Sequence, residues 1–364
     1  MNTVRLVDDL IPVILELNDT KWWPCDLQRL ALVSPAWVGP VRRRLYECPV
    51  LHTFQSCNLL ARTLAGNPAL CELVHGLNLR PASSRLPYQG LSGKNTASLR
   101  VLLNLKGLQS LTLGGSLAAH AERFLHMMTH ARSVTALHID GSHLRSFLDD
   151  CSQTASVEWS ELLAFRFPRL SCLHLSNIAL SIAHPSLPHP PSIEQLVLDN
   201  VVIVAGLLQH LCHESWQSIR MLHITTKQTL GEEDQLHEIL ESCERLESFS
   251  YEVDGKQQPD VVFEQVFPSV PSLKRLKLAH LDVTPRSLEL IGSLFERLEE
   301  LSISGRSARI TPGEWAGFIR SQSLRSLKVL TTSLGTNIPP FTPWTKEMKD
   351  CVLDACASCN IVLI

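Results

Sequence analysis

A short pattern, apolar-x-x-apolar-x-apolar, recurs ten times along this chain of 364 residues. Its first positions lie 34, 26, 36, 23, 26, 27, 27, 25 and 26 residues apart. They are Val74, Leu108, Val134, Leu170, Ile193, Ile219, Leu246, Leu273, Leu298 and Leu324. The last two apolar residues of each match are two apart, so they share one face of a short strand. One such strand cannot bury its face alone, whereas a stack of them gives a continuous core.

Between these strands the spacing of apolar residues becomes helical. Thr284-Pro285 and Thr311-Pro312 each combine a capping threonine with a proline suited to a first helical turn, and Glu314 completes a capping box. The step from Val134 to Leu170 holds about ten extra residues relative to its neighbours. We expect them between Leu144 and Phe167, as a longer or additional helix.

A period of about 26 residues with one strand and one helix resembles the leucine-rich-repeat family. The resemblance covers about residues 70 to 364 and implies an α/β solenoid, a horseshoe with a parallel concave sheet and helices on the convex side. We assign residues 51–344 to this solenoid. Residues 345–364 are predicted to form a last helix and strand that cap it, since terminal repeats hide the open core.

Residues 1–50 do not carry the repeat and are predicted to form a short helical domain. An acidic lead-in precedes the run Leu10-Ile11-Pro12-Val13-Ile14-Leu15, and Asp26 opens Asp-Leu-x-x-Leu-x-Leu-Val-Ser-x-x-Trp. These motifs resemble an F-box. The continuation Arg42-Arg43-Arg44-Leu45-Tyr46-Glu47-Cys48-Pro49 is similar to fungal F-box proteins with divergent leucine-rich repeats. The family usually has a Leu-Pro pair before the first helix, where this chain has Leu6-Val7.

The resemblance implies a non-catalytic substrate-recognition subunit of a cullin-RING (SCF-type) ubiquitin ligase, with no cofactor. The helical domain would dock onto a Skp-type adaptor, and the repeats would bind a protein substrate of unknown identity. The docking residues that the resemblance implies are Leu10, Ile11, Pro12, Ile14, Leu15, Leu27, Leu30, Val33 and Trp37. Alternatively, these helices only cover the first repeat, and the chain is a leucine-rich-repeat protein-binding scaffold without ligase docking.

Charge and hydropathy bear on the partners and the compartment. A net charge of −3 gives no case for nucleic acid as a partner, because phosphate binding needs a basic field. No uncharged apolar run reaches the roughly 18 residues of a membrane helix, and Asp8 and Asp9 replace the basic start of a signal peptide. The eleven scattered cysteines suit reduced thiols. We therefore expect a cytoplasmic or nuclear protein without a membrane partner.

The residue types that carry catalysis or bind metals do not form a recognisable motif. Neither a phosphate-binding GxxxxGK[ST] loop nor a GxSxG elbow occurs, which argues against a hydrolase or another enzyme on an α/β fold. Cys356 and Cys359 form one CxxC near Cys351, but a second pair and a clear fourth zinc ligand are missing. His126 and His130 lie four apart without the glutamate of HExxH, which favours surface or capping histidines.

The residue between the last two apolar positions points away from the core, so the repeats build an outward row. We expect a partner surface there, with His and Asp in the middle and positive charge toward the C-terminal end. The alternative is a solvated sheet face that is polar for that reason alone. Neighbouring strands lie about 4.8 Å apart, so His138 and His174 are expected to be adjacent. The candidate binding residues are His138, Asp140, His174, Asp199, His223, Glu252, Arg275, Lys277 and Lys328.

Overall fold

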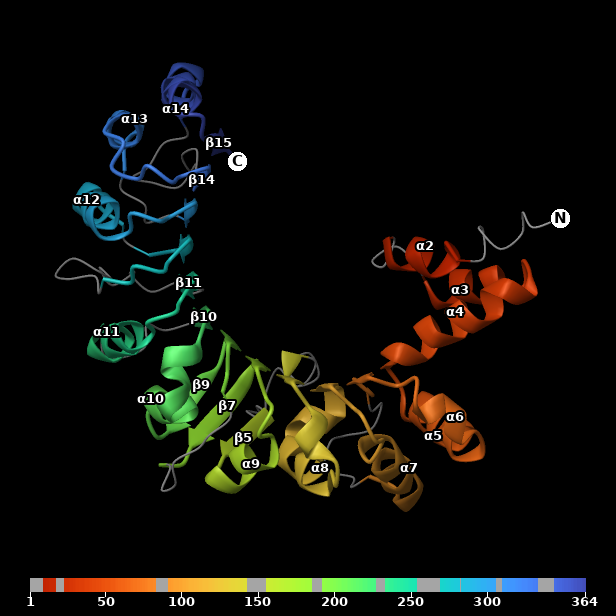
Figure 1. The fold of residues 1–364 in the computed structure, drawn as a ribbon. Coiled ribbons are helices and arrows are strands. Elements are labelled where there is room, and N and C mark those ends of the chain that lie inside the picture. Colours follow the sequence, from red (N-terminus) through yellow and green to blue (C-terminus); the bar gives the residue numbers. More distant parts are fainter. Residues whose placement is uncertain are drawn as a thin grey trace. The chain divides into compact units, whose positions relative to one another are not determined.

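The chain is mixed α/β, as the repeat pattern predicts, with helices between the strands of parallel sheets (Figure 1). The computed structural model describes residues 9–17, 23–82, 91–142, 155–184, 192–226, 233–253, 269–281, 283–305, 310–332 and 344–364. The chain divides into two compact units, Met1–Gln153 and Thr154–Ile364. None of the described helices has both the length and the apolar character of a membrane span.

Unit 1 begins with three helices and continues as alternating strands and helices. Its elements are α2 (Ile11–Leu17), α3 (Pro24–Ala31), α4 (Pro35–Glu47), β1 (Val50–Leu51), α5 (Phe54–Gly66), α6 (Pro68–Cys71), β2 (Gly76–Leu79), α7 (Gly93–Leu103), β3 (Ser110–Gly114), the 3-10 helix η2 (Gly115–His120), α8 (Ala121–Met127), the 3-10 helix η3 (Ala131–Ser133) and β4 (Ala136–Asp140). The strands pair in parallel in the order β1-β2-β3-β4. The repeat pattern did not predict β1, whose buried Leu51 pairs with Leu79.

Helices α2, α3 and α4 share a small apolar core. Ile11, Leu15, Leu27 and Val41 are buried in it. Trp23 occupies the N-cap position of α3, and Asp26 in the first turn accepts a hydrogen bond from the Trp23 N–H at 3.3 Å. Pro35 is the first residue of α4. A proline is tolerated there because the N–H group that it lacks would have no partner within the helix.

Unit 2 contains a longer run of strands and helices. Its elements are β5 (Ala155–Trp159), α9 (Glu161–Arg166), β6 (Cys172–Ser176), β7 (Ile178–Ile182), β8 (Gln195–Asp199), β9 (Val202–Ala205), α10 (Leu208–Cys212), the 3-10 helix η5 (His213–Ser218), β10 (Met221–Thr226), α11 (Glu233–Ser242), β11 (Ser248–Val253), β12 (Arg275–Ala279), α12 (Pro285–Leu294), β13 (Glu300–Ser304), α13 (Pro312–Arg320), β14 (Val329–Thr332), α14 (Lys346–Ser358) and β15 (Val362–Leu363). Helices α11 to α14 lie on one side of the strands that they connect (Figure 1).

The main sheet of unit 2 is parallel, in the order β6-β8-β10-β11-β12-β13-β14-β15. Its register aligns the apolar positions of the repeat. One buried row is Leu173, Leu196, Leu222, Phe249, Leu276, Leu301 and Leu330. The next is Leu175, Leu198, Ile224, Tyr251, Leu278, Ile303 and Thr332. The predicted triplets thus contribute in register to one core.

The register of the last predicted triplet, Leu324-Leu327-Val329, is wrong. Leu330, not Leu327, pairs with Leu301, and Thr331 takes the outward place beside Ser302 that we predicted for Lys328. The error arises because Leu324-Leu327-Val329 matches the pattern fully, whereas the series that the register selects, Leu327-Leu330-Thr332, ends on a threonine.

A second, smaller parallel sheet contains β5, β7 and β9. The expected extra helix between Leu144 and Phe167 is therefore only partly right, since the described part of that stretch holds strand β5 followed by the short helix α9. One residue separates β6 from β7, and two residues separate β8 from β9. Asn177 and Asn200 make these transitions with φ of 53° and 54°. Their side chains are hydrogen bonded, because the Asn200 amide donates to Asn177 Oδ1 at 2.5 Å.

A hydrogen bond from a serine hydroxyl to a backbone carbonyl recurs between neighbouring matches of the sequence pattern. Ser133 donates to the Leu108 carbonyl at 2.8 Å, Ser218 to that of Ile193 at 3.0 Å, and Ser272 to that of Leu246 at 2.9 Å. Each serine directly precedes the first apolar position of its own repeat. The helix caps predicted at Thr284 and Thr311 are confirmed, and each threonine caps a capping-box helix.

Candidate binding surface

The outward face of the main sheet in unit 2 contains the predicted rows. His174, Val197, His223, Ser250, Lys277 and Ser302 are in register across it, and so are Ser176, Asp199, Thr225, Glu252, Ala279 and Ser304. Arg275 lies on the same face of β12, two residues before Lys277, and is exposed. His138 and Asp140 belong to unit 1 and His174 to unit 2, so the predicted adjacency of His138 and His174 stays a prediction.

Two histidines of this face are hydrogen bonded to a hydroxyl on their own strand. His174 Nε2 lies 2.9 Å from Ser176 Oγ, and His223 Nε2 lies 3.1 Å from Thr225 Oγ1. Burial lowers the pKa of His223, and the charge of Lys277 lowers it further, although Asp199 and Glu252 act in the opposite direction. The His223 imidazole is therefore mainly uncharged at neutral pH.

The charged residues of the face differ in how they are paired. Lys277 Nζ lies 3.1 Å from Glu252 Oε2, so this cation and this carboxylate neutralise each other. The positive charge that we predicted toward the C-terminal end of the face is smaller than the sequence suggests, because Lys277 is paired and Lys328 does not belong to the row. Asp199 is half-buried, and its carboxylate is in no ion pair among the described residues.

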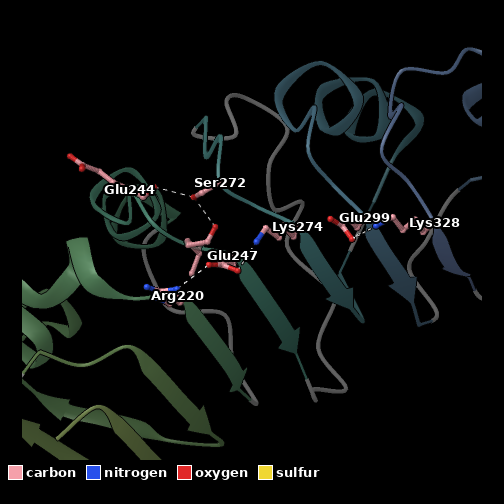
Figure 2. Close-up of polar contacts among 8 residues, drawn as sticks. Arg220, Glu244, Glu247, Ser272, Lys274, Glu299 and Lys328 are labelled. Atoms are coloured by element: carbon pink, nitrogen blue, oxygen red, sulfur yellow. Dashed lines mark hydrogen bonds and ion pairs between the residues drawn. The ribbon is translucent and has the colours of Figure 1, made fainter. Parts of the chain in front are cut away.

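Lys328 belongs instead to a ladder of alternating charges that stands just before the strands (Figure 2). Glu247 binds Arg220 at 3.4 Å and Lys274 at 2.9 Å, and Glu299 binds Lys328 at 2.7 Å. The hydrogen bonds from Lys274 and Lys328 and the charges of these lysines hold the pKa of Glu247 and Glu299 below the usual range. The basic side chains are exposed to water and the two glutamates are partly exposed, so each pair contributes little to stability.

In unit 1, an ion pair spans three strands. Arg80, just beyond β2, places Nη1 2.7 Å from Oδ2 of Asp140 at the end of β4. Strand β3 lies between β2 and β4, and its residue Gly114 is the register partner of Asp140. A Cβ at Gly114 would lie 2.8 Å from Arg80 Cγ. Because Gly114 has no side chain, the Arg80 side chain has room to cross β3 and reach Asp140. Asp140 also accepts a hydrogen bond from the Ser142 N–H at 2.9 Å.

Replacing Asp140 by asparagine is expected to lower the free energy of unfolding by about 1 to 3 kcal/mol at pH 7, because it leaves Arg80 without its charged partner. Burial raises the pKa of Asp140, but the Ser142 hydrogen bonds and the charges of Arg80 and His138 outweigh it, so the pKa lies below 3.8. Because the pKa of Asp140 is lower in the folded than in the unfolded chain, its ionised carboxylate stabilises the folded state above pH 3.8. This stabilisation is lost as the pH falls through the pKa of the folded state.

Urea unfolding of the wild type and of Asp140→Asn, between neutral pH and about pH 3.5, measures the difference in their free energies of unfolding. This difference should shrink toward the acidic end of the range. Asp354→Asn, on the exposed side of α14, is the matched control and should change stability by less than about 0.5 kcal/mol. A loss for Asp140→Asn as small as that of the control would show that the ion pair does not stabilise unit 1.

The N-terminal helices place the nine predicted docking residues in three environments. Ile11, Leu15 and Leu27 are buried, and we assign them to the helical core rather than to direct docking. Leu30 and Trp37 are half-buried and pack against that core. Leu10, Pro12, Ile14 and Val33 are exposed. The sequence reasoning missed further exposed apolar side chains in the same segment, namely Val13, Leu17, Trp23, Leu32 and Val38.

The candidate metal ligands are not gathered. Within the described ranges, no group of three or more His, Cys, Asp or Glu side chains is placed to hold a metal ion. Cys356 is buried, and the Cys359 thiol donates to the Ile319 carbonyl at 3.6 Å. His126 and His130 are exposed at the end of α8 and beyond it.

Compared with known protein families, the chain matches no family model, and it matches no curated protein sequence. Its function is inferred below from its residues and their geometry.

Proposed function

We propose that this chain is a non-catalytic substrate-recognition subunit of a cullin-RING ubiquitin ligase, acting in the cytoplasm or the nucleus. Helices α2, α3 and α4 dock onto a Skp-type adaptor. The strands and helices that follow form a leucine-rich-repeat solenoid, and the outward face of its sheet binds the protein substrate. Catalysis of ubiquitin transfer belongs to other subunits, and this chain contributes proximity.

The observation that carries the proposal is that α2 is apolar on two sides. Ile11 and Leu15 bury one side against α3 and α4. Leu10, directly before α2, and Ile14 and Leu17 within it lie at helical spacing on another side and are 50%, 38% and 79% exposed. A helix that is apolar around most of its circumference is buried on more than one side, so a partner surface is expected to cover the second side.

The turn between α3 and α4 adds to this exposed apolar surface. Leu32 is 86% exposed and Val33 67% exposed, in the Leu-Val-Ser segment on which the F-box resemblance rests. Exposed apolar side chains that occur singly are ordinary, but a group of them on one small helical segment indicates an interaction site.

The sheet supports the second half of the proposal. Strands of the main sheet of unit 2 pair in chain order and repeat one inward pattern, as stacked repeats require. Their outward rows vary from strand to strand among His, Val, Ser, Lys, Asp, Thr and Glu. A sheet whose inward side chains are almost all apolar and whose outward side chains vary in chemical type suits recognition of another protein.

The test is co-purification of the full chain with a Skp-type adaptor. Wild type should be retained, and Val33→Asp should weaken the complex at least about tenfold, because a carboxylate would be buried against an apolar partner. The change should leave the fold intact, since Val33 is exposed.

Val101→Asp is the matched control. Val101 is also an exposed valine, 42% accessible, but it lies on α7 outside the helical segment. This variant should bind the adaptor as wild type does. Failure of the wild-type chain to retain the adaptor would refute docking and leave a repeat scaffold without a ligase.

A further inference from the structure

Asp199 is an uncompensated charge on the outward face of the main sheet of unit 2. It ends β8, where its register neighbours are Ser176 on β6 and Thr225 on β10. Its backbone oxygen accepts a hydrogen bond from the Asn177 N–H at 2.7 Å. Within the described residues, however, its carboxylate forms neither an ion pair nor a hydrogen bond, although it is half-buried.

The groups around Asp199 do not neutralise it. The hydroxyls of Ser176 and Thr225 are engaged with His174 and His223 of their own strands. Lys277 is three strands away and is paired with Glu252. Three strand spacings amount to about 14 Å, which exceeds the screening length of about 8 Å at physiological salt. The adjacent His223 is mainly uncharged at neutral pH.

The surface next to Asp199 consists of one valine between two imidazole rings. Val197 lies two residues earlier on β8, on the same face, and is half-buried. The register places His174 on one side of Val197 and His223 on the other. Such a platform suits the methylene stem of a long cationic side chain, whose charged end then reaches a carboxylate beyond the platform.

We propose that Asp199 binds the charged end of a lysine or arginine side chain of the protein substrate. Val197, His174 and His223 contact the stem of that side chain. The inference rests on the proposed function, which gives this face to a substrate, and charge complementarity selects the occupant. A divalent cation fits less well, because it needs several oxygen ligands and the described residues gather no such set.

Peptides from a phage-displayed library of random dodecamers, selected on the immobilised full chain, provide the probe. We expect the selected peptides to be enriched in lysine or arginine. Asp199→Asn should raise their Kd about tenfold or more, since a charge-assisted hydrogen bond is lost while the side-chain shape is kept. Changing the basic residue of a peptide to methionine should weaken wild-type binding equally and add little to the effect of Asp199→Asn.

Glu300→Gln is the matched control, because it removes one negative charge from an exposed position of the same sheet on β13. It should change the Kd by less than about twofold. Selected peptides without basic enrichment, peptides that bind Asp199→Asn as well as wild type, or a library that yields no binder would each overturn the proposal. Adaptor retention by the Asp199→Asn chain is measured separately, so a failure of ligase docking is distinguishable from a failure at Asp199.

Discussion

Phe249→Ala is expected to lower the free energy of unfolding by about 3 to 5 kcal/mol, an effect typical of a large aromatic side chain removed from a packed core. Phe249 is 1% exposed, and its ring lies 6.4 Å from that of Tyr251 in a nearly parallel arrangement. It occupies the inward row of the main sheet between Leu222 and Leu276. Alanine would leave a cavity in the middle of that row, and the neighbouring strands could not close it without losing their register.

Ser250→Ala is the matched control, because Ser250 follows Phe249 on the same strand and faces outward. Its hydroxyl oxygen is covered by neighbouring atoms and has no hydrogen-bond partner in the part of the chain that the structure describes. Removing it should leave stability within about 0.5 kcal/mol of wild type or raise it slightly. Denaturant unfolding of the three proteins gives both values. A loss below about 1 kcal/mol for Phe249→Ala would mean that the inward row does not form the core.

The inward rows could be predicted from the sequence because each depends on residue type alone. Leucine, isoleucine, phenylalanine or tyrosine recurs at fixed offsets, and the strand period of two then decides which side chains are buried. The prediction failed at the last triplet because Thr332 takes an inward place that a search for apolar residues passes over. A second signal was available. Residues directly after the first apolar position alternate in charge as Arg220, Glu247, Lys274, Glu299 and Lys328, which assigns Leu327 to that position.

Contacts between strands were harder to predict, since they depend on which side chains are absent or already engaged. The Arg80–Asp140 ion pair requires a glycine at position 114, because the Arg80 side chain passes over that residue. The amino-acid sequence does not show that these three residues lie side by side. Asp199 and Glu252 looked equivalent in sequence, but Lys277 lies beside only one of them. For the N-terminal helices, the motif gave one list of apolar residues, and only the packing separates those in the core from those on the surface.

Gly305→Ala is expected to lower the free energy of unfolding by about 2 to 4 kcal/mol, because two separate costs coincide at this position. Gly305 follows β13 with φ of 108°, a conformation that residues with a side chain rarely adopt. An added Cβ would lie 2.6 Å from the His280 nitrogen and 2.7 Å from its Cα. These are backbone atoms beside β12 and cannot swing away. The His280 N–H also donates to the Ser304 carbonyl at 2.8 Å, so a shift would break a contact between repeats.

Two further variants separate the conformational cost from the steric one. Gly317→Ala, in helix α13 with no atom within 4 Å of the added Cβ, should raise stability by about 0.5 to 1 kcal/mol. Gly305→Asn tests whether a residue tolerant of positive φ rescues the site, since Asn177 and Asn200 hold the corresponding positions after β6 and β8 at φ of 53° and 54°. Because the Cβ contact with His280 remains, Gly305→Asn should lose nearly as much as Gly305→Ala. Recovery to wild-type stability with asparagine would instead show that the turn relaxes to the conformation of Asn177 and that β12 and β13 tolerate a side chain there.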